Sequence, residues 1–130
     1  MEWVFKGLLA RSSRPGYPET EVTCQTVESW VKHVRYQGIR TIICVLGQDE
    51  LVAYYRQLPR GLLYEYQEQG LEVEVIPLPD YSDPPVEAQQ LTAVHKAYLR
   101  LPKPILIHCS AGMVRTEKAV RFLRQKIIVT

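Results

Sequence analysis

A thiol, a guanidinium and a hydroxyl are concentrated in one short stretch of the chain, which reads HCSAGMVRT from residue 108 to residue 116. An apolar segment at 104–107 precedes this stretch and a segment with helical spacing follows it, so we expect a strand, a tight loop and then a helix. Backbone N–H groups at the start of a helix bind anions. The arrangement therefore predicts a site for a phosphate group.

Cys109 is the candidate nucleophile of this stretch. Thiolate is the reactive form of cysteine, and a helix N-terminus or a nearby cation lowers the pKa of a thiol. Arg115 follows six residues later and offers a planar fork that binds two phosphoryl oxygens, a geometry that lysine does not reproduce. We expect the phosphate-binding backbone to be that of Ser110, Ala111, Gly112, Met113 and Val114, with Gly112 permitting the backbone conformation that such a loop needs.

The stretch resembles the signature of the cysteine-dependent protein tyrosine phosphatases, in particular their small dual-specificity-like members: His-Cys, five residues, Arg, then Ser or Thr. The resemblance implies that Cys109 attacks phosphate to form a covalent cysteinyl-phosphate and that Arg115 binds substrate and transition state. It implies that Thr116 helps the thiolate to leave in the second step. It also implies that His108 orders the loop and tunes the thiol rather than acting as a general base.

Covalent phosphoryl transfer also needs an acid for the leaving oxygen and a base for water. Members of this family carry that residue on a loop roughly thirty residues before the cysteine, and Asp80 lies 29 residues before Cys109. Asp83 is the alternative general acid, but it has a structural explanation as the N-cap of a helix whose first turn holds Pro84 and Pro85. Asp80 is therefore the favoured assignment.

The rest of the chain predicts an α/β fold in which helices flank a central, mostly parallel sheet, as in the phosphatases that the signature resembles. Residues 1–130 fit a single domain. In the segment 3–10 we expect an edge strand, and Asp49 is expected to cap a helix that ends before Pro59. Further strands are expected at 39–46, 71–75 and 104–108, and helical spacing occurs at 27–34, 51–58, 62–69, 88–98 and 119–127. Active loops then lie at the carboxyl ends of the strands.

Composition limits the classes of function. A formal net charge of +2 gives no reason to expect nucleic-acid binding, and no apolar run approaches the length of a membrane span. The three cysteines, at 24, 44 and 109, form neither a disulfide framework nor a metal spacing. Neither a metal nor a cofactor is expected. A nucleophilic thiol requires a reducing compartment, which predicts a cytoplasmic protein.

The predicted partner is a phosphorylated protein, with phosphotyrosine first and phosphoserine or phosphothreonine next, or another phosphomonoester. The five loop positions carry no lysine, which argues against highly charged inositol lipids. Two alternatives remain: an arsenate-reductase-like thiol redox enzyme, and an adaptor that binds phosphate without turnover. The intact Cys109 argues against the adaptor, and the position of the motif late in the chain argues against the reductase.

Three further features stay open at this point. Cys44 is either a small core residue, which is favoured, or a resolving thiol that protects Cys109. Glu117 stands where many relatives have glycine and is expected to affect substrate preference. For the tyrosines, helical spacing favours packing in the core and at its rim over an aromatic binding surface; they are Tyr54, Tyr55, Tyr64 and Tyr66.

Overall fold

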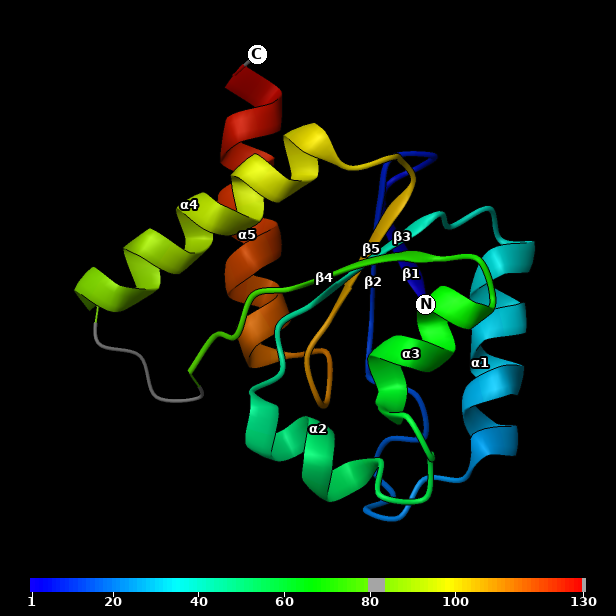
Figure 1. The fold of residues 1–130 in the computed structure, drawn as a ribbon. Helices are drawn as coiled ribbons and strands as arrows, with labels where there is room; N and C mark the ends of the chain where they lie inside the picture. Colours follow the sequence, from blue (N-terminus) through cyan, green and yellow to red (C-terminus); the bar gives the residue numbers. More distant parts are fainter. Residues whose placement is uncertain (80–83, 130) are drawn as a thin grey trace.

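A five-stranded sheet lies between two groups of helices in the computed structural model, which describes residues 1–79 and 84–129 (Figure 1). The spatial order of the strands is β1-β2-β5-β3-β4. Strand β1 is antiparallel to β2, and the pairs β2·β5, β5·β3 and β3·β4 are parallel. The strands are β1 (Glu2–Phe5), β2 (Leu9–Ser12), β3 (Thr41–Cys44), β4 (Glu72–Val75) and β5 (Ile105–His108). The prediction of a mostly parallel α/β sheet is confirmed.

Five helices complete the described part of the chain. They are α1 (Cys24–Tyr36), α2 (Gln48–Tyr54), α3 (Gly61–Glu68), α4 (Pro84–Arg100) and α5 (Val114–Val129). Figure 1 shows α1 and α3 together on one side of the sheet, and α4 packed against α5 on the other. None of the helices in the described ranges combines the length and apolarity that crossing a bilayer requires.

Alternate residues of the central strands feed two separate hydrophobic cores. Ile42 of β3 and Leu106 of β5 pack with the buried faces of α1 and α3, whereas Ile43 and Ile107 pack with α4 and α5. All four side chains are fully buried. Both faces of these strands are therefore covered, which explains why their sequences are continuously apolar.

The first segment differs from the prediction of one edge strand at 3–10. Gly7 has a φ of +80°, and the amide of Leu8 donates to the carbonyl of Phe5 at 2.9 Å. The chain turns there, so that β1 and β2 form a hairpin with Trp3 opposite Ala10. The hairpin places β2 beside β5, which leaves β1 as the outer strand.

The expected cap at Asp49 is wrong. Helix α2 has Gly47 as its N-cap, and the Gly47 amide donates to Oε1 of Glu50 at 3.0 Å. The cap lies two residues earlier than expected, so Asp49 belongs to the first turn of the helix, where a carboxylate interacts favourably with the helix dipole. The helix also ends at Tyr54 rather than near Leu58, because the Tyr54 carbonyl accepts a hydrogen bond from Val22 at 3.1 Å.

Candidate active site

The loop formed by residues 109–113 connects the middle strand β5 to the first turn of α5, and we call it the phosphate loop after the role that the sequence predicts for it. Figure 1 shows it at the lower edge of the sheet, where the chain also leaves β3 to enter α2. The Glu117 amide donates to the Met113 carbonyl at 2.8 Å, which begins the hydrogen bonding of α5 directly at the loop. The predicted sequence of strand, loop and helix is confirmed.

Cys109 lines a pocket of about 340 Å³, which we call the thiol pocket. Residues of the phosphate loop and of the start of α5 line the pocket together with Tyr17, Glu50 and Tyr54. The Cys109 side chain is 2% exposed. Helix N-terminal dipoles favour negative charge at such a position.

Gly112 brings a backbone donor to the sulfur. Its amide lies 3.2 Å from Cys109 Sγ and donates to it. The residue has a φ of +77°, and a Cβ at this position would lie only 2.6 Å from the carbonyl oxygen of Ser12 at the end of β2. Glycine is therefore required twice here, for its backbone conformation and for the close approach of β2.

Arg115 enters the thiol pocket from the second residue of α5 and is 5% exposed. Its Nη1 donates to Oε1 of Glu50 at 2.6 Å, and its Nη2 donates to Oε2 at 2.8 Å. These hydrogen bonds are the main cause that lowers the pKa of Glu50 below its usual range. The guanidinium is thus held by a bidentate carboxylate at the edge of the pocket.

His108 is fully buried behind the phosphate loop. Its Nδ1 lies 2.9 Å from the carbonyl oxygen of Cys109, and its Nε2 lies 2.8 Å from the hydroxyl of Tyr66. Because a carbonyl only accepts, the proton belongs on Nδ1, and Nε2 accepts from Tyr66. Burial lowers the pKa of His108 to about 4, so the ring is neutral at physiological pH. The histidine fixes the Cys109 backbone without contributing charge.

Thr116 is also fully buried, and its hydroxyl has no hydrogen-bond partner within the described part of the chain. An unpaired buried hydroxyl is costly, and such groups occur where function requires a donor.

The predicted general acid, Asp80, and its alternative, Asp83, lie outside the described residues. Pro77, Leu78 and Pro79, which lead to them, line a cleft of about 610 Å³ that shares Glu50, Tyr54 and Arg115 with the thiol pocket.

Arg14 is a site residue that sequence reasoning missed. It is 2% exposed, and its guanidinium carbon lies 4.0 Å from the centre of the Tyr54 ring. Its Nε donates to Ser110 Oγ at 3.1 Å, and its backbone amide donates to the Ser110 carbonyl at 2.8 Å. A second donor, Nη2, reaches the carbonyl of Glu19 at 2.7 Å. Arg14 therefore fastens the start of the phosphate loop and supports a tyrosine of the pocket wall.

Arg11 was missed in the same way and holds the other end of the loop. Its Nη2 donates to the Gly112 carbonyl at 2.9 Å, and its Nη1 forms an ion pair with Glu117. That contact with Arg11 is the main cause that lowers the pKa of Glu117. The structure thus gives Glu117 a partner on β2, whereas the sequence suggested only an effect on substrate preference.

Cys44 and Cys109 belong to opposite cores. Cys44 packs with the α1 side of the sheet, and Cys109 packs with the α4 and α5 side. Burial raises the pKa of Cys44 to about 12. A protonated thiol is a poor partner for exchange, so the structure favours the core role for Cys44 over a resolving role. Its cross-strand neighbour is His108.

Two of the tyrosines, Tyr55 and Tyr66, are buried in the core, as spacing predicted. Tyr54 is partly buried and packs at the rim of the α1-side core, which agrees with the prediction, and it also lines the thiol pocket. Within residues 1–79 and 84–129, no group of three or more His, Cys, Asp or Glu side chains gathers in a way that could hold a metal ion.

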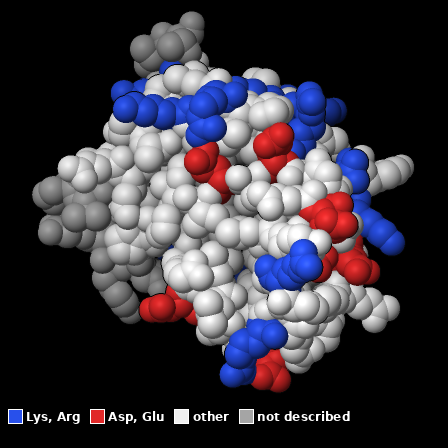
Figure 2. Space-filling model, viewed as in Figure 1, with Lys and Arg blue, Asp and Glu red and all other residues white. Residues whose placement is uncertain are grey.

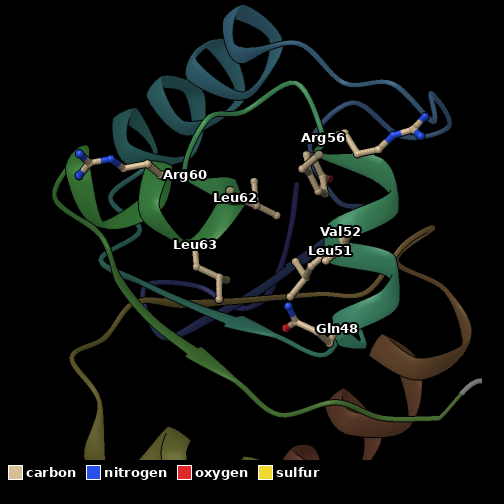
Figure 3. Close-up of a pocket in the computed structure, with 9 residues that line it drawn as sticks. Gln48, Leu51, Val52, Arg56, Arg60, Leu62 and Leu63 are labelled. Atoms are coloured by element: carbon tan, nitrogen blue, oxygen red, sulfur yellow. The ribbon is translucent and has the colours of Figure 1, made fainter.

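A further cavity of about 340 Å³ lies between α2 and α3, away from the thiol (Figure 3). Leu51, Leu62 and Leu63 point into it, whereas Arg56 and Arg60 point outward. Arg56 pairs with Glu21 at 2.6 Å, and Arg60 lies over the Tyr64 ring. The lining therefore offers an apolar space without a group suited to catalysis.

Solved structures of phosphatases share this architecture. The core catalytic domain of the PP-IP phosphatase Siw14 from S. cerevisiae matches with a TM-score of 0.58 and 18% identity over 90% of this chain. The chain spans 60% of that structure's length. Kinase associated phosphatase, KAP, matches with a TM-score of 0.57 and 20% identity over 90% of this chain and 74% of its own.

A mutant form of Tk-PTP also matches, with a TM-score of 0.57 and 20% identity over 96% of this chain and 81% of its own. No protein-family model matches the chain, and no curated protein matches it in sequence. The structural likeness and the position of Cys109 after the middle strand show that the chain has the fold of the cysteine-dependent, tyrosine-phosphatase-like enzymes.

Proposed function

We propose that the protein is a phosphomonoester hydrolase that works through a covalent cysteinyl-phosphate on Cys109. One observation carries the proposal: a buried sulfur receives the Gly112 amide at 3.2 Å in the same pocket that Arg115 enters. A sulfur anion and a phosphoryl group are stabilised by the same donors, because both are negative and both occupy the N-terminal end of α5. The named structural neighbours are phosphatases, which agrees with this assignment.

In the first step the Cys109 thiolate attacks phosphorus, so that the S–P bond forms as the P–O bond to the leaving group breaks. Asp80, or alternatively Asp83, gives its proton to the leaving oxygen. In the second step the same carboxylate takes a proton from water, water attacks phosphorus, and the P–S bond breaks to release inorganic phosphate. The loop amides bind the phosphoryl oxygens throughout, together with N–H groups of Arg115 other than the two that donate to Glu50. The unpartnered hydroxyl of Thr116 is the donor assigned to the departing sulfur.

Glu50 is a positioning residue in this mechanism. Its two oxygens hold Arg115 in one orientation. Because Glu50 lies in the first turn of α2, the segment that follows β3 determines where the Arg115 guanidinium is held. A guanidinium held in advance loses less conformational freedom when phosphate binds. The carboxylate also compensates part of the positive charge near the thiol.

The rim of the thiol pocket favours an aromatic phosphate ester on a protein. Tyr17, Tyr54, Met113 and Val114 line the pocket, and no lysine is among the described residues that line it. Aromatic and aliphatic side chains contact a phenyl ring well, whereas an inositol polyphosphate needs several cations around the reacting phosphate. We assign phosphotyrosine as the first substrate class, with phosphoserine and phosphothreonine next, in a reducing, cytoplasmic compartment.

The test is hydrolysis of para-nitrophenyl phosphate by purified protein in the presence of EDTA. We expect turnover without added metal, inhibition by vanadate, and loss of turnover in Cys109→Ser with the fold retained. Acid quenching during turnover should trap phosphate on the wild-type protein and none on the serine variant. Turnover by Cys109→Ser at the wild-type rate would refute the mechanism, and arsenate reduction coupled to oxidation of Cys44 would favour a redox enzyme. Binding of phosphopeptide without turnover would favour an adaptor.

A further inference from the structure

A surface groove continues from the mouth of the thiol pocket along the first two turns of α5. It has a volume of about 380 Å³ and is lined by Met113, Val114, Glu117, Lys118 and Arg121; we call it the α5 groove. Met113 and Val114 line the thiol pocket as well. A substrate whose phosphate lies at Cys109 therefore meets the groove directly.

The inner end of the groove is apolar and exposed. Met113 is 67% exposed and Val114 is 60% exposed, although both belong to the part of the chain that surrounds the thiol. The amide groups of the loop need no such side chains in order to bind phosphate. Exposed aliphatic groups beside a reactive centre provide a contact surface for an apolar part of the substrate.

The outer end of the groove is cationic. The negative charge of Glu117 is compensated by its ion pair with Arg11. Lys118 follows on the same turn, and the exposed Arg121 lies one turn further along α5. Lys and Arg also form a band along the upper edge of the molecule in Figure 2, but that edge is opposite the phosphate loop in Figure 1. The α5 groove thus joins basic side chains directly to the catalytic end.

We propose that the α5 groove binds the segment flanking the phosphorylated residue of a protein substrate, with an aliphatic side chain over Met113 and Val114 and an acidic side chain at Arg121. The proposal rests on the phosphatase function proposed above. Arg121 lies seven helical residues beyond Val114, or about 10 Å along the axis. An extended peptide covers that distance in about three residues. The acidic residue is therefore expected about three or four positions from the phosphoresidue.

A set of phosphotyrosine peptides tests this specificity. Each carries an aliphatic residue near the phosphotyrosine and either glutamate or glutamine three or four positions away, on the N-terminal or the C-terminal side. Arg121→Gln is the test variant. Arg124→Gln is the matched control, because Arg124 is exposed on the same helix and also acts electrostatically on Glu117 but does not line the groove.

With wild-type protein we expect the best glutamate peptide to have a KM about two- to fivefold below that of its glutamine counterpart, as a partly exposed ion pair gives. Arg121→Gln should remove this difference and Arg124→Gln should keep it, while both variants hydrolyse para-nitrophenyl phosphate at the wild-type rate. The proposed binding role of the groove would be overturned if the glutamate and glutamine peptides had equal KM values, or if Arg121→Gln and Arg124→Gln reduced the difference in KM equally. Hydrolysis of the aryl phosphate but of no peptide would overturn it too, whereas failure on every phosphate ester refutes the proposed function itself.

Discussion

Replacing Gly112 with alanine should damage stability and catalysis together. The new Cβ would lie 2.6 Å from the Ser12 carbonyl oxygen and 2.7 Å from the Ser13 nitrogen, where ordinary contacts begin at 3.4 Å. The phosphate loop and the end of β2 must therefore separate by about 0.8 Å. A left-handed backbone costs an alanine a further ~1–2 kcal/mol. Since the Gly112 amide is bonded to Cys109 Sγ, the separation shifts the donor that stabilises the sulfur.

Gly61→Ala is the matched control for backbone strain. Gly61 has a φ of +84°, close to the +77° of Gly112, but a Cβ added at Gly61 would have nothing within 4 Å. In urea unfolding, we expect the free energy of unfolding to fall by about 1–3 kcal/mol more in Gly112→Ala than in Gly61→Ala, because only Gly112→Ala overpacks a contact. The kcat on para-nitrophenyl phosphate should fall about 10- to 100-fold in Gly112→Ala alone, because sub-ångström misplacement costs rates of that order. If the two variants match in both stability and kcat, the steric argument is wrong.

Three further outcomes are expected. Glu50→Gln keeps an acceptor for the Gly47 amide but removes the charge that holds Arg115. The kcat should therefore fall about tenfold, while helix α2 stays folded. An unchanged kcat would show that Arg115 needs no carboxylate. Arg14→Lys keeps the charge but loses the planar contacts with Tyr54 and Ser110. It should lower the free energy of unfolding, measured by urea titration, by ~2–3 kcal/mol. An unchanged free energy of unfolding would refute the role of Arg14 in holding the loop. The pKa of His108 is about 4 in the folded protein and near 6.5 in the unfolded chain. Between these two pH values the unfolded state therefore binds a proton that the folded state does not. As the pH falls from 6.5 to 4, the free energy of unfolding should fall by about 3 kcal/mol. The urea midpoint of the wild-type protein should fall with pH over this range, and the midpoint of His108→Gln should depend on pH much less. If the pH dependence is the same in His108→Gln, groups other than His108 cause the loss of stability.

The candidate site divides into parts that the sequence could predict and parts that it could not. The thiol, Arg115 and the loop amides lie within one short stretch, and a strand followed by a helix was enough to place them around one pocket. Glu50 contacts Arg115 across 65 positions, and Arg14 contacts Ser110 across 96. Periodicity predicts that β2, β3 and β5 exist but not that β5 lies between the other two. Without that order, no pattern connects these residues to the site.

Local errors have local physical causes. The hairpin of β1 and β2 depends on Gly7, whose positive φ reverses the chain within a mostly apolar segment that was expected to form one strand. At α2, Glu50 accepts the Gly47 amide, and the helix starts from Gly47, two residues before the cap position that Asp49 was expected to occupy. In both places a single residue decides the backbone path, and its effect is not visible in the spacing of apolar positions.

The phosphate loop explains why so many arginines gather at one end of the sheet. Residues 109–113 belong to neither β5 nor α5, so much of their backbone lacks the hydrogen bonds of a ladder or a helix and needs other partners. Arg14 and the Arg14 amide hold Ser110, Arg11 holds the Gly112 carbonyl, and His108 holds the Cys109 carbonyl. Glu117 and Glu50 balance the added positive charge without entering the loop. These contacts hold the loop backbone in place, which agrees with the proposed function, because donors that are fixed in advance stabilise a transition state most effectively.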